Sequence, residues 1–140
     1  MESMEKINSP YWALRIAFGA VPFLAGLDKF FNILTHWDKY LSPLAQHFLP
    51  VSATTFMHFA GIVEMIVGIA ILTRWTRLGS YVAAVWLVGI ALNLLAAGFL
   101  DVAVRDLVMA VGAYTLGRLS EVRAAEMAPV RSSVRMPGIA

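Results

Sequence analysis

Four apolar segments of the chain are each about as long as a helix that crosses a lipid bilayer. They are Tyr11–Leu34, Phe56–Thr73, Leu78–Phe99 and Val102–Leu119. A membrane-spanning helix needs about 20 predominantly apolar residues, with a range of roughly 17–25. Hydrophobic residues make up 59% of the 140 residues and charged ones 14%, which argues against a water-soluble globule and against disorder. The segments therefore predict an all-α fold, a four-helix transmembrane bundle in contact with the lipid bilayer.

The rest of the chain is expected to be peripheral to this bundle. Residues 1–10 form a leader with one basic residue, Lys6, and so lack the basic region of a signal peptide. Residues 11–119 form the transmembrane domain, and residues 120–140 are expected to be a disordered cytoplasmic tail. The long connection Thr35–Thr55 is too apolar for a free linker, which favours a short helix lying on the membrane surface.

The other two connections are short. Arg74–Arg77 joins the second and third apolar segments so tightly that they must be antiparallel neighbours. Leu100–Asp101 joins the third and fourth segments, and Asp101 is expected to be the N-cap of the last helix.

The distribution of basic residues predicts the orientation in the membrane. Eight of the 11 fall on one side of the expected bundle and three on the other, and they punctuate apolar runs instead of forming a stripe that would bind nucleic acid. The positive-inside rule then places both termini in the cytoplasm and the long loop outside, in a multi-pass protein of the bacterial inner membrane. The eight are Lys6, Arg15, Arg74, Arg77, Arg118, Arg123, Arg131 and Arg135, and the three are Lys29, Lys39 and Arg105.

Ionisable residues inside apolar segments are costly in lipid and mark either buried pairing or function. Glu64 lies about eight residues, or roughly 12 Å, inside the second segment. We expect it to be protonated or paired with Lys29, Arg105 or Arg15. A buried ion pair that fixes helix register and a carboxylate that handles protons or binds a ligand are both open interpretations.

Small residues accompany these charges at helical spacing. Gly19 and Gly26 share a face with Arg15 and Lys29, and Glu64 shares one with flanking glycines, so close helix packing is expected on both faces. On this interpretation Arg15 is a structural polar residue that snorkels at the inner end of the first helix.

Polar residues of all four segments fall in the outer half of the predicted bundle. Asn93 is most simply a hydrogen-bonding contact between helices. If the residues converge, they form a polar cavity that opens outward, with Glu64 as its floor and Lys29 and Arg105 at its rim. The alternative is that each polar residue separately holds its own helix against a neighbouring one. The candidate ligand-binding residues are Asp28, Lys29, Glu64, Asn93, Arg105 and Asp106.

Several chemistries have no support in the sequence. The chain has no cysteine, which excludes disulfides, thiolate metal sites and a cysteine-based redox relay. There is no phosphate-binding or dinucleotide motif and no metalloprotease motif. The histidines at 36, 47 and 58 lack metal-ligand spacing on a confident helix, so no metal site is predicted.

The order of landmarks resembles the DoxX-like family of small four-helix membrane proteins. The resemblance spans roughly residues 14–119 and rests on the stretches Leu14–Gly19 (LRIAFG), Ala25–Phe30 (AGLDKF), Gly61–Glu64 (GIVE) with Gly68, Thr73–Arg77 (TRWTR) and Arg105–Leu107 (RDL). It implies that Arg15, Lys29 and Glu64 are family landmarks, whereas Asp28 and the aromatic loop look like features of a subgroup. Members are similar to subunits of thiosulfate:quinone oxidoreductase, and others are associated with oxidative-stress and thiol-handling assemblies.

Three functions follow from these observations, in descending order. The first is an accessory or anchoring subunit of a membrane redox complex, with a membrane or peripheral redox protein as partner and room for a quinone near Glu64 and Lys29. The second is a small-solute or proton-linked transporter, which needs a homo-oligomer because four helices are few for one. A stand-alone enzyme comes last, because no nucleophile or metal constellation is present.

Overall fold

The computed structural model describes residues 2–129, and within them the chain is helical and has no strand, which confirms the all-α prediction. Four long helices are present in this part. They are α1 (Glu2–Asp28), α3 (Ala53–Leu72), α4 (Thr76–Ala97) and α5 (Leu100–Met127). The loop between α1 and α3 holds a 3₁₀ turn, η1 (Trp37–Tyr40), and a short helix, α2 (Pro43–Phe48). A short helix was expected in this loop, and Ser42 caps it by accepting a hydrogen bond from the Ala45 N–H.

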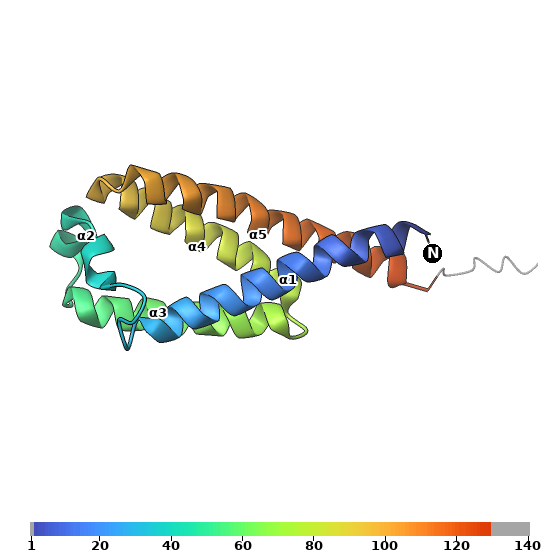
Figure 1. Cartoon of the computed structure of the whole chain (residues 1–140), viewed down its shortest axis with the longest axis horizontal. Helices are drawn as coiled ribbons and strands as arrows, with labels where there is room; N and C mark the ends of the chain where they lie inside the picture. The colour runs from blue at the N-terminus through green and yellow to red at the C-terminus, as the bar shows by residue number, and fades with distance from the viewer. Residues whose placement is uncertain (1, 130–140) are drawn as a thin grey trace, which may run out of the picture.

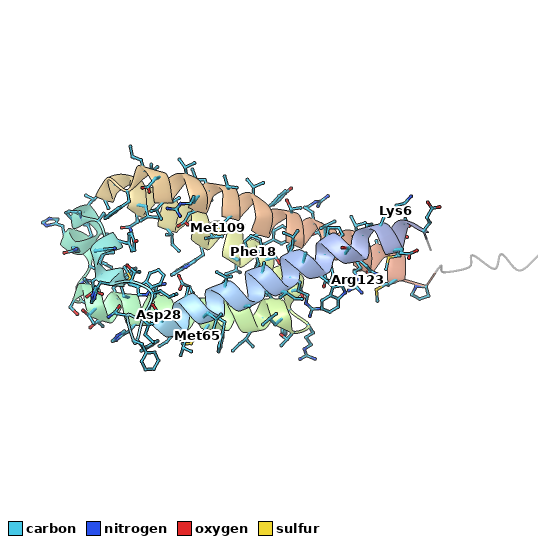
Figure 2. All side chains as sticks on the ribbon, in the orientation of Figure 1. Lys6, Phe18, Asp28, Met65, Met109 and Arg123 are labelled. Carbon is cyan, nitrogen blue, oxygen red and sulfur yellow. The ribbon has the colours of Figure 1, made fainter. Side chains whose placement is uncertain are left out.

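Three of the long helices, α1, α3 and α4, are long and apolar enough to cross a membrane. Helix α5 has the length but carries more charge, because its apolar stretch includes Arg105, Asp106 and Arg118. Figure 2 shows side chains projecting outward along all four helices, and many large apolar ones are more than half exposed. Apolar surface of this extent needs lipid or another protein to cover it.

The helices are arranged as two pairs. Helix α1 packs mainly against α3, and α4 packs mainly against α5, as Figure 1 shows. The start of α1 and the end of α5 lie together at what we call the terminal end, and they extend beyond the turn between α3 and α4, which points the same way and lies beside the middle of α1. Helix α2 and the turn between α4 and α5 lie at the opposite, loop end. The predicted antiparallel arrangement of α3 and α4 is confirmed.

Two helix bounds differ from the sequence expectation. Helix α1 begins at Glu2, so the leader is part of it, and it ends at Asp28 although the apolar run continues to Leu34. Helix α5 runs past residue 119 to Met127, so the first part of the expected tail is helical, and residues 130–140 lie outside the described part. These extensions support each other, since Arg123 donates a hydrogen bond to Asn8.

The start of α5 corrects a further expectation. Asp101 is not its N-cap; Phe99 holds that position without a side-chain hydrogen bond, and Asp101 lies inside the first turn. There it forms an i,i+4 ion pair with Arg105. The preceding helix ends at Gly98, whose φ of 85° is a left-handed conformation that glycine adopts without strain.

Glycines bring α1 and α3 into close contact, as their spacing predicts. A Cβ added to Gly26 would collide with the carbonyl oxygen of Gly61, and one added to Gly61 would collide with that of Gly26. A Cβ on Gly68 would lie 2.6 Å from the carbonyl oxygen of Gly19. The two backbones therefore touch at two levels, and these contacts set the height of α1 against α3.

Candidate functional site

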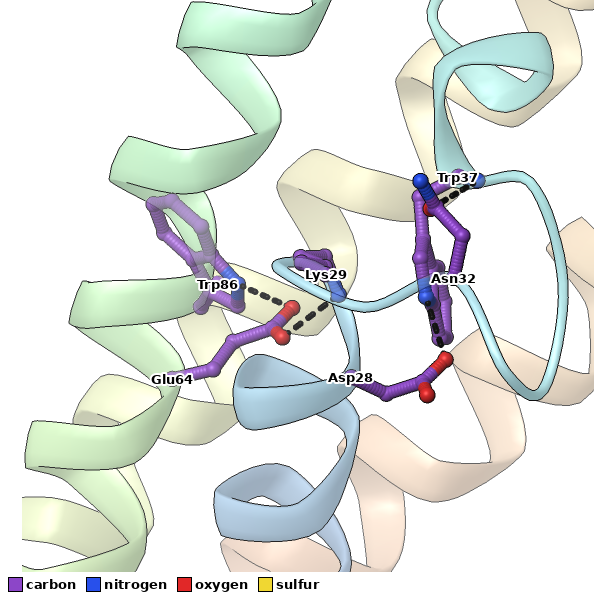
Figure 3. Close-up of polar contacts among 6 residues, drawn as sticks. All are labelled: Asp28, Lys29, Asn32, Trp37, Glu64 and Trp86. Atoms are coloured by element: carbon purple, nitrogen blue, oxygen red, sulfur yellow. Dashed lines mark hydrogen bonds and ion pairs between the residues drawn. The ribbon is translucent and has the colours of Figure 1, made fainter.

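A buried ion pair joins the two helices of this close contact near the loop end. The Nζ of Lys29, the residue after α1, lies 2.6 Å from Oε2 of Glu64 on α3 (Figure 3). The two side chains are only 6% and 10% exposed. Of the three partners expected for Glu64, the structure selects Lys29. The pair follows from the glycine contact, because Lys29 and Gly26 lie one turn apart and so do Glu64 and Gly61.

Two tryptophans border the ion pair. The indole N–H of Trp86 on α4 donates a long hydrogen bond of 3.4 Å to Oε1 of Glu64. The ring of Trp37 from η1 lies over Lys29, with Nζ 3.8 Å from its centroid, which is a cation–π geometry. Each charge therefore has a second partner besides the other, as a charge buried from water requires.

Asp28 closes the end of α1. Its carboxylate accepts hydrogen bonds from the backbone N–H groups of Ile33 and Leu34, both at 3.0 Å, and from the indole N–H of Trp37 at 2.9 Å. Asn32, with φ 52°, makes the turn in between. Asp28 thus holds Trp37 in place over Lys29, and its contacts are those of a positioning residue (Figure 3).

Asn93 on α4 was expected to form a contact between long helices, but its partners are backbone groups of the loop. Its amide donates to the carbonyl oxygen of Tyr40 at 2.7 Å, and its side-chain oxygen accepts from the Ser42 N–H at 2.9 Å. It therefore fastens the loop, between η1 and α2, to α4. A second fastening comes from Thr54 at the start of α3, whose hydroxyl donates to Asp38 at 2.6 Å.

The two candidate site residues of α5 have different surroundings. Arg105 is exposed and lies 3.6 Å from the Asp101 carboxylate, so it is not at the rim of a cavity with Glu64. Asp106 is 7% exposed and lies on the buried face of α5 with Ala103 and Ala110. The charges of Glu64 and Lys29 are close enough to act on it electrostatically.

Arg15 lies at the other end of the α1–α3 contact. Its guanidinium donates to the carbonyl oxygens of Ile71, Leu72 and Thr73 at 3.0, 3.1 and 2.5 Å. These carbonyls have no partner within the helix, so Arg15 serves as a side-chain cap for the C-terminus of α3. The expected structural role of Arg15 thus has a specific form.

Two hollows in the surface lie away from this ion pair. One, of about 500 Å³, is an apolar groove along α4 and α5. The second lies between α2 and α4 beside Asn93. Among residues 2–129 no three histidine or acidic side chains are grouped as metal ligands, and His58 stacks on Phe30.

Sequence reasoning missed Trp37 and Trp86 as parts of the site. Both were visible as aromatic residues, Trp37 in the loop and Trp86 deep in a predicted span. Nothing local links Trp37 to Asp28 nine positions earlier, because the link depends on the path of the turn. The predicted site therefore included the charges and omitted the aromatic groups that border them.

A model of the DoxX family matches residues 11–99, which include α1 from Tyr11, the whole loop, α3 and α4. Comparisons with curated proteins and with solved structures give no match. The matched region is more than half of the chain and contains Arg15, Lys29, Glu64 and both tryptophans. The chain therefore belongs to the DoxX family and, with its apolar helices, is a membrane protein.

Proposed function

We propose that this chain is a non-catalytic, membrane-embedded subunit of a quinone- or thiol-linked redox complex of the bacterial cytoplasmic membrane. The proposal builds on membership of the DoxX family and on the similarity of other DoxX-like proteins to subunits of thiosulfate:quinone oxidoreductase, which the sequence resemblance implies. The chain has no cysteine, so any thiol chemistry falls to a partner protein or a substrate. Its own contribution is an anchor in the bilayer and a polar group at quinone depth.

The observation that carries the proposal is the buried Lys29–Glu64 pair between two tryptophans. A quinone headgroup is a flat ring with carbonyl oxygens that accept hydrogen bonds. The Lys29 ammonium has three donor hydrogens, and Glu64 occupies one of them. The indoles of Trp37 and Trp86 supply flat apolar surfaces beside that donor. This combination suits an aromatic acceptor better than it suits an anion, since Glu64 already neutralises Lys29.

The test is purification from native membranes in mild detergent, with mass spectrometry of copurifying proteins and extracted quinones. The double variant K29M/E64L removes both charges and keeps the apolar volume. We expect it to retain the protein partner and to lose the quinone. The control K39Q changes an exposed lysine of the loop and should retain both. A wild-type protein that always purifies alone and without quinone contradicts the proposal.

The proposal includes an orientation with both termini in the cytoplasm and α5 as a fourth span. It is supported by the direction of the α3–α4 turn, which carries Arg74 and Arg77 and points to the same end of the molecule as the start of α1 and the end of α5. The charges of α5 do not oppose the span, because Asp106 faces the protein interior, while Arg105 and Arg118 are exposed near the two ends of the span, where they can snorkel.

A second candidate, a small-solute or proton-linked transporter, is favoured by Asp106 near the Lys29–Glu64 pair. It requires an oligomer, and the glycines of α1 and α3 are already used within the chain. The surface around Gly89 on α4 has space for a partner, since a Cβ there would meet nothing within 4 Å. Flux into proteoliposomes that stops on Glu64→Gln would support the transporter, and unchanged flux would exclude this role for Glu64.

A further inference from the structure

Asp106 differs from the other buried acidic residues of the chain in its partners. Asp28 accepts three hydrogen bonds, and Glu64 has Lys29 and Trp86. Asp106 is as buried as they are, at 7% exposure, but no donor of residues 2–129 forms a hydrogen bond or ion pair with it. Lys29 is engaged by Glu64, and Arg105 is engaged by Asp101.

The carboxyl group of Asp106 still borders open space. Every fully enclosed side-chain nitrogen or oxygen of the described residues has a hydrogen-bond partner. Because Asp106 has none, its oxygens must keep contact with space that a water molecule can reach. The residue thus lies on the buried face of α5 with Ala103 and Ala110, yet its tip is accessible.

The charges around Asp106 do not balance it. Glu64 of α3 and Lys29 after α1 act on it together, and they neutralise each other as an ion pair. Arg105 of its own helix also acts on Asp106, but its guanidinium is exposed to solvent and shared with Asp101. An ionised carboxylate at this depth would therefore lack a buried partner charge of its own, and such a group in an apolar medium binds a proton in preference to remaining charged.

We propose that Asp106 is a proton-binding site, which holds a proton as a carboxylic acid and exchanges it with water at the loop end of the helices. The step is a simple protonation: one carboxylate oxygen forms an O–H bond with a proton supplied by water or buffer. A metal cation is a poorer occupant, because it needs several oxygen ligands, and alanines and the Lys29 ammonium lie near Asp106 instead. The inference does not rest on the redox role or on a partner.

The test is infrared spectroscopy of the full chain in lipid nanodiscs. We expect the C=O stretch of a protonated carboxylic acid at neutral pH, which is lost in Asp106→Asn and shifts on deuteration. Asp101→Asn is the matched control: it changes an acidic residue five positions earlier on the same helix that is exposed and paired with Arg105. That variant should keep the band unchanged.

Other results would overturn the proposal. These are the absence of the band at neutral pH, its persistence in Asp106→Asn, or its removal by Na⁺ or K⁺ at constant pH, which would indicate a cation site. Asp106→Glu guards against misfolding of the asparagine variant, because it should keep helix content and a shifted carboxylic band. Its failure to show any such band would also count against the assignment. The readout is independent of bound quinone and of copurifying proteins.

Discussion

The strongest electrostatic feature at the scale of single residues is the ion pair of Lys29 and Glu64. Burying two charges is costly, so the intact pair adds little to the free energy of unfolding. Removing one partner is strongly destabilising, because the other charge then stays buried without a partner. The single variants Lys29→Met and Glu64→Leu should each lose about 3–5 kcal/mol of stability. The double variant should recover most of that loss, because no unpaired charge is left. The measurement is the thermal unfolding midpoint by circular dichroism in detergent.

A double variant as unstable as the single ones would contradict this account. It would indicate that Trp37 and Trp86 contribute more than the attraction between the two charges. Arg105→Gln, which removes an exposed partner of Asp101, is the comparison and should change the midpoint little.

Asp28 leads to a second prediction at this scale. Asparagine has one acceptor oxygen in place of two, so Asp28→Asn leaves at least one of three donors without a full partner. The expected cost is about 1–3 kcal/mol, concentrated in the turn that holds Trp37. Hydrogen-exchange mass spectrometry should show faster exchange over residues 29–42. Asp38→Asn is the control, because its side-chain oxygen can still accept from Thr54. Equally faster exchange in both variants would contradict the specific role of Asp28 in holding this turn.

At the scale of elements, the glycine contact between α1 and α3 determines where the charged residues lie. Gly68→Ala would bring a Cβ within 2.6 Å of a carbonyl oxygen and 3.0 Å of the backbone nitrogen of Phe23. Backbone atoms cannot move aside as a flexible side chain can, so we expect a loss of about 1–3 kcal/mol. Gly89→Ala, in open space on α4, should be neutral or gain up to about 1 kcal/mol from helix propensity.

The thermal unfolding midpoints of these two variants test the contact directly. If Gly68→Ala matches wild type, the helices do not approach as closely as described. A fall in Gly89→Ala would instead point to a partner on that face of α4.

The same elements show what the sequence can predict. Length and apolarity identified the four long helices, and helical periodicity identified the glycine faces. The cost of a charge at its depth predicted that Glu64 is either protonated or paired with a base, and the structure shows the pair with Lys29. The early end of α1 was not predictable, because residues 29–34 are as apolar as the helix before them, and only the path of the chain brings the Asp28 carboxylate to two backbone N–H groups. The role of Asn93 was missed for a similar reason, since its partners are backbone groups of a loop.

For the whole molecule, the contacts within the α1–α3 pair differ from those that join this pair to α4 and α5. Between α1 and α3 the backbones touch through glycines, and a charge pair and an arginine cap secure the two ends of the contact. The α1–α3 pair is joined to α4 and α5 by fewer contacts, and the loop bridges the pairs through Asn93. The polar residues that we consider functional therefore lie on the inner surfaces of two pairs, at the end that the loop covers.

Membrane topology is the prediction that belongs to this scale. The chain has no cysteine, so each introduced cysteine is the only thiol. Four exposed positions are suitable, two at the loop end, His47→Cys and Leu100→Cys, and two at the terminal end, Ser9→Cys and Ala125→Cys. In intact cells a membrane-impermeant maleimide should label the first two, and it should label the second two only after permeabilisation.

Leu100 and Ala125 lie near the two ends of α5, so labelling of both from one side would mean that α5 does not cross the bilayer. Labelling of the terminal-end positions alone would reverse the orientation that the arginines predict.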